Sequence, residues 1–296
     1  MSHNEMTSRE RFCMTMAFET PDRVPYFEEG IRDEVLEAWR GQGLAKGADL
    51  GSLFPSDIRQ EIILDLDPKP EMEILPKNAA GLADLETRLN PEDPRRLPQD
   101  WSEFTSSTTD DGAVRMLRIH RGLFLTMGVR SWDRFKEVME LIVDHPDIVR
   151  QIMLIQGRFC TGLAERVLKK IKVDAAIFSE PIGGNDRPLI SPKMYEDLVL
   201  ESYTPVLDVL RQNNVNTFIF RTFANSRILI PSIIKWGFNC LWACEVNCEA
   251  MDYRAIRKTF GKDLRLIGGI DLDALRHGRE AVYREVMEKV PPLLEQ

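Results

Sequence analysis

The second half of the chain alternates short apolar runs with longer amphipathic segments. Apolar runs at 173–178, 215–220, 240–244 and 264–268 lack polar alternation, so each predicts a strand that is buried on both faces. Segments with helical periodicity separate them. This alternation predicts repeated βαβ units and a parallel sheet, which is either doubly wound or closed as a barrel.

Capping signals mark the helices between these strands. A serine followed by proline is typical of a helix start, and a glycine after the last turn is typical of a helix end. These signals predict helices over residues 191–212, 226–236 and 252–260.

The first half of the chain has a less regular pattern. Thr7 and Glu10 match a capping box and predict a helix that ends before Pro21, with Phe12 and Met16 on its apolar face. Further along, the sequence predicts a strand at 24–27, a helix that begins at Ser56 with Ile58, Ile62 and Ile63 facing inward, a strand at 114–119, and helices at 132–143 and 146–171.

Residues 68–112 are rich in prolines and turn-forming residues. Pro91, Pro94 and Pro98 all lie in this stretch, which predicts an irregular surface excursion with little regular core. The whole chain, residues 1–296, is expected to form a single domain that includes this excursion.

Composition narrows the class of protein. The chain has 296 residues with 47 acidic and 39 basic side chains, and this acidic excess argues against nucleic-acid binding. No apolar run reaches the ~18 residues of a membrane span, and the N-terminus lacks an apolar signal segment. We therefore expect a cytoplasmic protein without a membrane partner. Its five cysteines form an odd, sparse set that predicts reduced thiols.

Four predicted strands are each followed by an ionisable residue, and these residues are Glu180 (after Ser179), Arg221, Glu245 and Asp271. Parallel α/β folds bind ligands at the carboxyl ends of their strands, so we expect these four side chains to form one catalytic site. Carboxylates there suit general acid/base chemistry, and an arginine suits a bound carboxylate.

Two other patterns predict less chemistry. Cys240, Cys244 and Cys248 lie too far apart along a strand for one zinc ion, so we interpret them as buried small side chains and expect no metal site. The pairs Gly183–Gly184 and Gly268–Gly269 lack a phosphate-binding fingerprint and predict turns. No serine or cysteine is paired with a histidine in a way that predicts covalent hydrolysis.

Several short motifs, taken in order, resemble the uroporphyrinogen decarboxylase superfamily. They are Thr7–Arg11 with Pro21–Pro25, Ser179–Pro181 with Pro188–Pro192 and Tyr195, and Glu245, Met251–Asp252, Arg257, Gly261 and Gly268–Asp271. The resemblance spans residues 7 to about 290. It implies a (β/α)₈ barrel with its site at the carboxyl-end rim, and it places Arg32, Tyr195, Asp252 and Gly269 among the substrate-binding residues.

The resemblance implies two activities. One is cofactor-free decarboxylation of uroporphyrinogen, and the other is methyl transfer to or from a corrinoid protein, often with zinc. The decarboxylases carry an arginine-rich stretch where this chain has Tyr26–Arg32, and the zinc enzymes carry His-x-Cys where it has Arg221–Phe223. These differences favour a divergent methyltransferase that uses a methylcobamide on a partner protein, with a folate or an amine as acceptor.

Two alternatives stay open, namely tetrapyrrole decarboxylation and a non-catalytic corrinoid-binding partner. An open pocket lined by the four predicted residues favours an enzyme, whereas mutual pairing without a cavity favours the non-catalytic partner. Members of the family often form homodimers. Family chains also continue into one more strand and helix after the region near Leu293, so the barrel is expected to lack its last strand–helix unit here.

Overall fold

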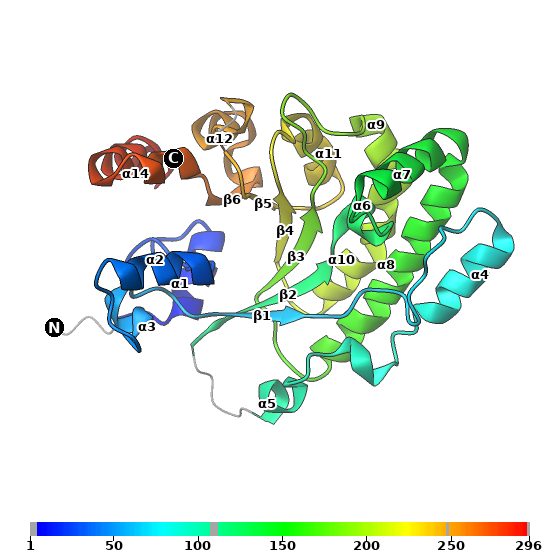
Figure 1. Cartoon of the computed structure of the whole chain (residues 1–296), viewed down its shortest axis with the longest axis horizontal. Coiled ribbons are helices and arrows are strands. Elements are labelled where there is room, and N and C mark those ends of the chain that lie inside the picture. Colours follow the sequence, from blue (N-terminus) through cyan, green and yellow to red (C-terminus); the bar gives the residue numbers. More distant parts are fainter. Residues whose placement is uncertain (1–4, 107–111, 247–248, 295–296) are drawn as a thin grey trace. The chain divides into compact units, whose positions relative to one another are not determined.

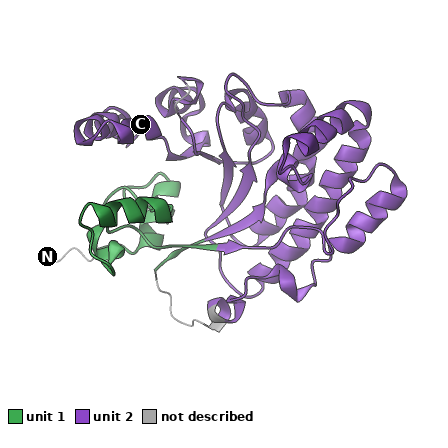
Figure 2. Ribbon diagram, in the orientation of Figure 1, with its two compact units in different colours: residues 1–61, 108–115 green, residues 62–107, 116–296 purple. Residues whose placement is uncertain are grey.

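The computed structural model describes residues 5–106, 112–246 and 249–294. The chain divides into two compact units, which the sequence analysis does not predict (Figure 2). Unit 1 contains residues 1–61 and 108–115, and unit 2 contains residues 62–107 and 116–296.

The described residues of unit 1 form the helices α1 (Ser8–Met16), α2 (Asp33–Gly41) and α3 (Leu50–Leu53). The predicted capping box is confirmed, because the Thr7 hydroxyl accepts the Glu10 backbone N–H at 3.2 Å. The predicted strand at 24–27 is wrong. The Tyr26 N–H donates to the Asp57 carboxylate at 2.8 Å and the Asp57 N–H donates to the Tyr26 carbonyl at 2.7 Å, so this backbone pairs with Asp57 and not with a sheet.

The helix predicted from Ser56 is also wrong, because Arg59–Ile63 form strand β1. The buried residues here are Ile62, Leu64 and Leu66, which recur every second position. That period belongs to an extended chain and not to a helix. Ile58 and Ile63, which we expected to face inward, are 58% and 54% exposed.

The sheet has six parallel strands in the order of the sequence, from β1 to β6 (Figure 1). The later strands lie where the apolar runs predict them. The bounds are β2 (Val114–His120), β3 (Ala175–Glu180), β4 (Thr217–Thr222), β5 (Cys240–Ala243) and β6 (Arg265–Gly268). A doubly wound sheet reverses its strand order at a switch point, and this order contains no reversal.

Helices lie between the strands and after the last one. They are α4 (Ala79–Arg88), α5 (Trp101–Ser106), α6 (Gly122–Thr126), α7 (Trp132–Asp144), α8 (Pro146–Leu168), α9 (Pro192–Tyr195), α10 (Glu201–Gln212), α11 (Ile230–Lys235), α12 (Tyr253–Phe260), α13 (Leu272–Arg276) and α14 (Arg279–Leu294). A π-helical segment, Glu196–Leu200, joins α9 to α10, so the helix predicted over 191–212 has three parts. The expectation that residues 68–112 hold little core is wrong in part, because α4 buries Leu85 and the chain around it buries Leu75 and Leu89.

Alternate residues of each strand contribute to one large apolar core with the helices. On β3 and β4, Ala176, Phe178, Phe218 and Phe220 belong to this core. The residues between them face the other side of the sheet, because successive strand side chains point in opposite directions. This alternation decides which side chains at the strand ends meet.

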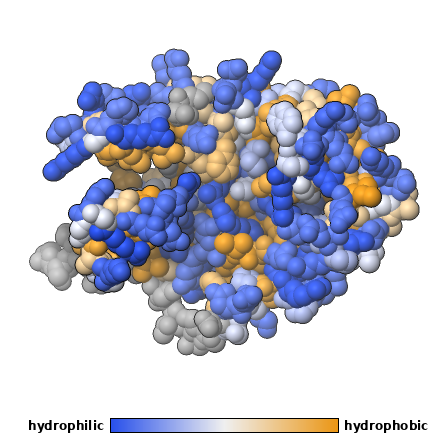
Figure 3. Space-filling model, viewed as in Figure 1, coloured by the Kyte–Doolittle hydropathy of each residue, from blue (hydrophilic) through white to orange (hydrophobic). Residues whose placement is uncertain are grey.

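On the face of unit 2 shown in Figure 3, hydrophilic residues predominate at the surface. None of the helices in the described part of the chain is long and apolar enough to cross a membrane.

Candidate functional site

The strand register separates two of the residues that we expected to share a site. Ser179 of β3 pairs with Arg221 of β4, and Glu180 pairs with Thr222. Glu180 is therefore one position out of step with Arg221, and neighbouring positions point to opposite faces. Glu180 lies on the face that packs against helices, and Arg221 lies on the other face.

Glu180 is the centre of a buried polar cluster, which we call the Glu180 cluster and which comprises His120, Glu180, Tyr195 and Tyr203. One carboxylate oxygen of Glu180 accepts the hydroxyls of Tyr195 at 2.9 Å and Tyr203 at 2.8 Å. The other accepts the Leu123 backbone N–H at 2.9 Å. All three donors are neutral, so they provide hydrogen bonds without a counter-charge.

Burial raises the pKa of Glu180 to about 7, and the three hydrogen bonds oppose part of this rise. Burial also lowers the pKa of His120 to about 3, with the positive charge of Arg121 adding to the effect. His120 is therefore neutral at pH 7. Its Nδ1 accepts the Gly122 N–H at 2.9 Å, so the proton lies on Nε2, which has no hydrogen-bond partner among the described residues.

The Glu180 cluster is sealed from solvent, since none of its four side chains is more than 2% exposed. It connects the end of β2, the start of α6, the end of β3 and two helical segments after β3. A carboxylate in this position holds these elements together and positions the neighbouring strand ends.

The opposite face carries a more open group, which we call the Arg221 edge and which comprises Arg221, Trp242 and Cys244. The Arg221 guanidinium carbon lies 4.4 Å from the centre of the Trp242 ring, within cation–π distance. The Arg221 Nε donates to the Cys244 sulfur at 3.3 Å. Arg221 and Cys244 are both partly exposed. A cation that donates to sulfur favours the thiolate form, which is the nucleophilic form of cysteine.

The other predicted site residues have varied positions. Glu245 is exposed and follows Cys244 in the chain. Asp271 and Asp252 each cap a helix, accepting a backbone N–H at 2.9 Å two residues further on. Gly269 has a φ of +101°, and a Cβ there would lie 2.6 Å from the Tyr253 ring. Arg32 lies in unit 1, where its exposed side chain is 3.7 Å from Glu34.

The structure thus brings Glu180 together with Tyr195, and it places Arg221 on the other face of the sheet. Turn geometry and helix capping account for Gly269, Asp252 and Asp271. Two cavities lie elsewhere among the described residues, and none of the eight predicted residues lines them.

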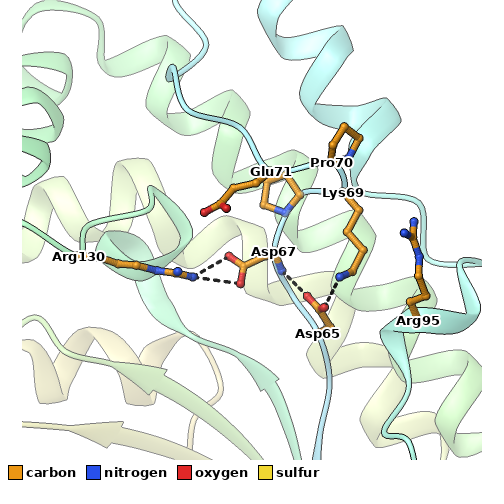
Figure 4. Close-up of a pocket in the computed structure, with 8 residues that line it drawn as sticks. Asp65, Asp67, Lys69, Pro70, Glu71, Arg95 and Arg130 are labelled. Atoms are coloured by element: carbon orange, nitrogen blue, oxygen red, sulfur yellow. Dashed lines mark hydrogen bonds and ion pairs between the residues drawn. The ribbon is translucent and has the colours of Figure 1, made fainter.

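One of these cavities has a volume of about 350 Å³ and follows the carboxyl end of β1 (Figure 4). Its lining residues are Asp65, Asp67, Pro68, Lys69, Pro70, Glu71, Arg95 and Arg130. The other cavity belongs to unit 1, and its lining residues are Thr7, Arg9, Glu10, Cys13 and Gly112.

The donor set at the Arg221 edge does not fit a zinc site of the His-x-Cys kind. Arg221, Thr222 and Phe223 follow one another here, and arginine and phenylalanine are not zinc ligands. Among the described residues, no three His, Cys, Asp or Glu side chains are grouped closely enough to hold a metal ion. Cys248 lies outside the described residues, and Cys240 is buried with a pKa raised to about 12 by burial.

Sequence reasoning missed four residues that matter here: Tyr203, His120, Cys244 and Asp67. Tyr195 and Tyr203 are eight positions apart, about two helical turns, and this spacing was a usable signal for a shared face. Asp67 follows β1, so it was missed once that segment was predicted to be a helix. Cys244 is predicted to be a buried small side chain because a strand cannot present two of the three cysteines to one zinc ion. That prediction is wrong, since Cys244 is partly exposed.

Neither the known protein-family models nor the sequences of curated proteins give a match to this chain.

Proposed function

We propose that this chain is a barrel enzyme of the uroporphyrinogen decarboxylase type that transfers a methyl group to or from a corrinoid protein, with the Arg221 edge as its reactive site. The strand order supports the barrel part of the proposal. Six parallel strands follow one another without reversal, as they do in a (β/α)₈ barrel. The Arg221 edge also lies where such folds place their chemistry, at the carboxyl ends of β4 and β5.

The observation that carries the proposal is the contact between Arg221 and Cys244. A methyl group on cobalt requires a soft nucleophile, and a cysteine sulfur held beside a guanidinium is one. In the proposed step the sulfur lone pair forms the new S–C bond, and the methyl carbon leaves cobalt without its bonding electrons. Cobalt keeps that pair as Co(I), and the thiol proton passes to solvent.

Tetrapyrrole decarboxylation receives less support from the same edge. Uroporphyrinogen carries many carboxylates, and its binding needs several cations that face it. Of the four residues predicted at the strand ends, Arg221 is the one cation, and Glu180, Glu245 and Asp271 are acidic.

The proposal is tested by incubating the protein anaerobically with methylcobalamin and a panel of thiol, amine and folate acceptors. The readouts are the absorbance of cob(I)alamin and the mass of the intact protein, which rises by one CH₂ when a cysteine is methylated. Cys244→Ala is expected to abolish both signals, and Arg221→Met is expected to slow the reaction about tenfold. Cys13→Ala, which removes an exposed cysteine from unit 1, is the matched control and keeps full activity.

Three results would overturn the proposal. The first is the absence of cob(I)alamin with every acceptor. The second is release of carbon dioxide from uroporphyrinogen, which would establish the decarboxylase. The third is tight binding of methylcobalamin without transfer, which would establish the non-catalytic partner.

A further inference from the structure

The geometry points to a second binding site, the cavity after β1, which takes a small zwitterion that carries both an oxyanion and an ammonium group. Such a site is separate from methyl transfer and does not depend on it. It is supported by the size of the cavity, by the rigidity of its loop, and by the donors and acceptors on its wall that have no partner among the described residues. The volume of about 350 Å³ falls in the range of small-molecule sites.

The loop that forms the cavity, residues 65–71, is held from behind by two arginines. Arg96 is fully buried and donates to the backbone carbonyls of Asp65, Asp67 and Arg88. Arg88 donates to the carbonyls of Pro70 at 3.0 Å and Glu71 at 3.2 Å. A loop fixed by so many carbonyl contacts is preorganised, so binding need not order it.

Two carboxylates of the cavity are already neutralised by cations. Asp65 forms an ion pair with Lys69. Asp67 forms an ion pair with Arg121. It forms a second with Arg130 at 3.2 Å (Figure 4). The hydrogen bond from Arg121 is the largest cause of a lowered pKa for Asp67, so this carboxylate is ionised at pH 7 and fixes both arginines.

The cations keep donors that nothing in the described residues uses. Arg130 contacts Asp67 through Nη2, which leaves Nε and Nη1 for a ligand, and its side chain is 63% exposed. Lys69 uses its ammonium for one ion pair and so has further N–H groups to offer. Guanidinium and ammonium donors of this kind bind phosphate or carboxylate oxygens.

Glu71 is the complementary half of the site. It lines the same cavity as Arg130, and its carboxylate has no hydrogen bond or ion pair with the described residues. A simple anion at Arg130 would be repelled by this charge. A ligand with an ammonium group beside its oxyanion satisfies both sides of the cavity at once.

Isothermal titration calorimetry with phosphoethanolamine, β-alanine and inorganic phosphate tests the site. Phosphoethanolamine and β-alanine carry an ammonium near a phosphate or a carboxylate, so their comparison identifies the preferred oxyanion. Wild-type protein is expected to bind at least one of them more tightly than inorganic phosphate.

Two substitutions separate the halves of the site. Arg130→Gln is expected to weaken binding of the zwitterion and of inorganic phosphate about tenfold. Glu71→Gln is expected to weaken the zwitterion about tenfold and to tighten inorganic phosphate about threefold, because it removes both an attraction and a repulsion. Arg158→Gln is the matched control, since Arg158 also pairs with one carboxylate, Glu86 at 2.6 Å, and does not line the cavity.

Binding of neither zwitterion would overturn the inference. So would equal effects of Arg130→Gln and Arg158→Gln, which would indicate a general charge effect. Glu71→Gln shifting both classes of ligand in the same direction would show that Glu71 does not contact an ammonium. Calorimetry needs no methyl transfer, so these outcomes are distinct from failure of the proposed activity.

Discussion

Glu180 and Asp67 are two carboxylates near the carboxyl ends of parallel strands in one sheet, and their surroundings are opposite in kind. Glu180 accepts three neutral donors inside the core, and burial raises its pKa to about 7. Asp67 is partly exposed beside two arginines, and the pKa of its carboxyl is lowered. A position at a strand end therefore does not set the chemistry of a carboxylate. Its pKa is set by the face to which the side chain points and by the charges that lie beside it.

The largest loss of stability at the Glu180 cluster is expected when a methyl group is added at Gly122. This glycine has a φ of +82°, and a Cβ there would clash with the Glu180 carboxylate and lie 2.6 Å from the Ser179 carbonyl oxygen. We expect Gly122→Ala to lower the free energy of unfolding by roughly 4 kcal/mol, from overpacking and backbone strain together. Urea denaturation measures the change.

Gly128→Ala is the control, because Gly128 also has a positive φ, +71°, but nothing lies within 4 Å of its Cβ position. Backbone strain alone then predicts a loss of about 1 kcal/mol. Equal losses in the two variants would show that the packing around Glu180 is looser than the structure indicates.

The opposite pKa shifts of the two carboxyls predict that they change the stability of the fold with pH in opposite directions. Glu180 titrates near 4.5 when unfolded and near 7 when folded, so the folded chain binds a proton that the unfolded chain has released. Its contribution is fully present below pH 4.5 and is lost as pH rises through about 7, a change of about 3 kcal/mol. Asp67 has a lowered pKa, so its contribution is present above its unfolded pKa and is lost as pH falls through the folded value.

The urea concentration at the midpoint of unfolding, measured from pH 3 to pH 9 in roughly one-unit steps, separates the two contributions. Glu180→Gln is expected to remove the fall in stability between about pH 4.5 and 7. It is expected to leave the loss of stability at low pH unchanged. Asp67→Asn is expected to make the fall in stability at low pH shallower, while Asp57, whose pKa is also lowered, still contributes to that fall. A Glu180→Gln variant that keeps the wild-type slope above pH 5 would show that Glu180 is not the group that titrates there.

A smaller loss of stability is expected when one hydrogen bond of the Glu180 cluster is removed. Tyr203→Phe removes the 2.8 Å hydrogen bond to Glu180 and leaves the ring contacts with Phe178 and His120. We expect a loss of about 2 kcal/mol at pH 8, where Glu180 is ionised, and a smaller loss at pH 5. The titration of Glu180, followed by carboxyl ¹³C NMR, should also move to higher pH, because this hydrogen bond lowers its pKa. Equal losses at both pH values would contradict the assignment.

Local pattern was enough to predict much of unit 2. Uninterrupted apolar runs predicted β3 to β6 to within two residues at either end, and β3, β4 and β5 are largely buried as expected. The expected burial is wrong for β6, whose four residues are partly or fully exposed. The Ser191 cap was also readable, since its hydroxyl accepts the Met194 N–H at 3.2 Å in a contact between near neighbours. Pattern failed at β1, where the buried Ile62 and Leu64 alternate in a segment too short to distinguish from a helix.

The apolar runs alone are enough to identify an α/β chain with parallel strands and to place charged residues near the ends of several strands. Glu180 and Arg221 are predicted to follow their strands but lie within β3 and β4. Tertiary structure alone decided which of those residues meet. A shift of one residue in strand register turns a side chain to the other face, and no local pattern encodes that register. For this reason Glu180 lies in the core with two tyrosines, Arg221 lies against Cys244, and Asp67 lines a cavity with residues that are distant in the chain.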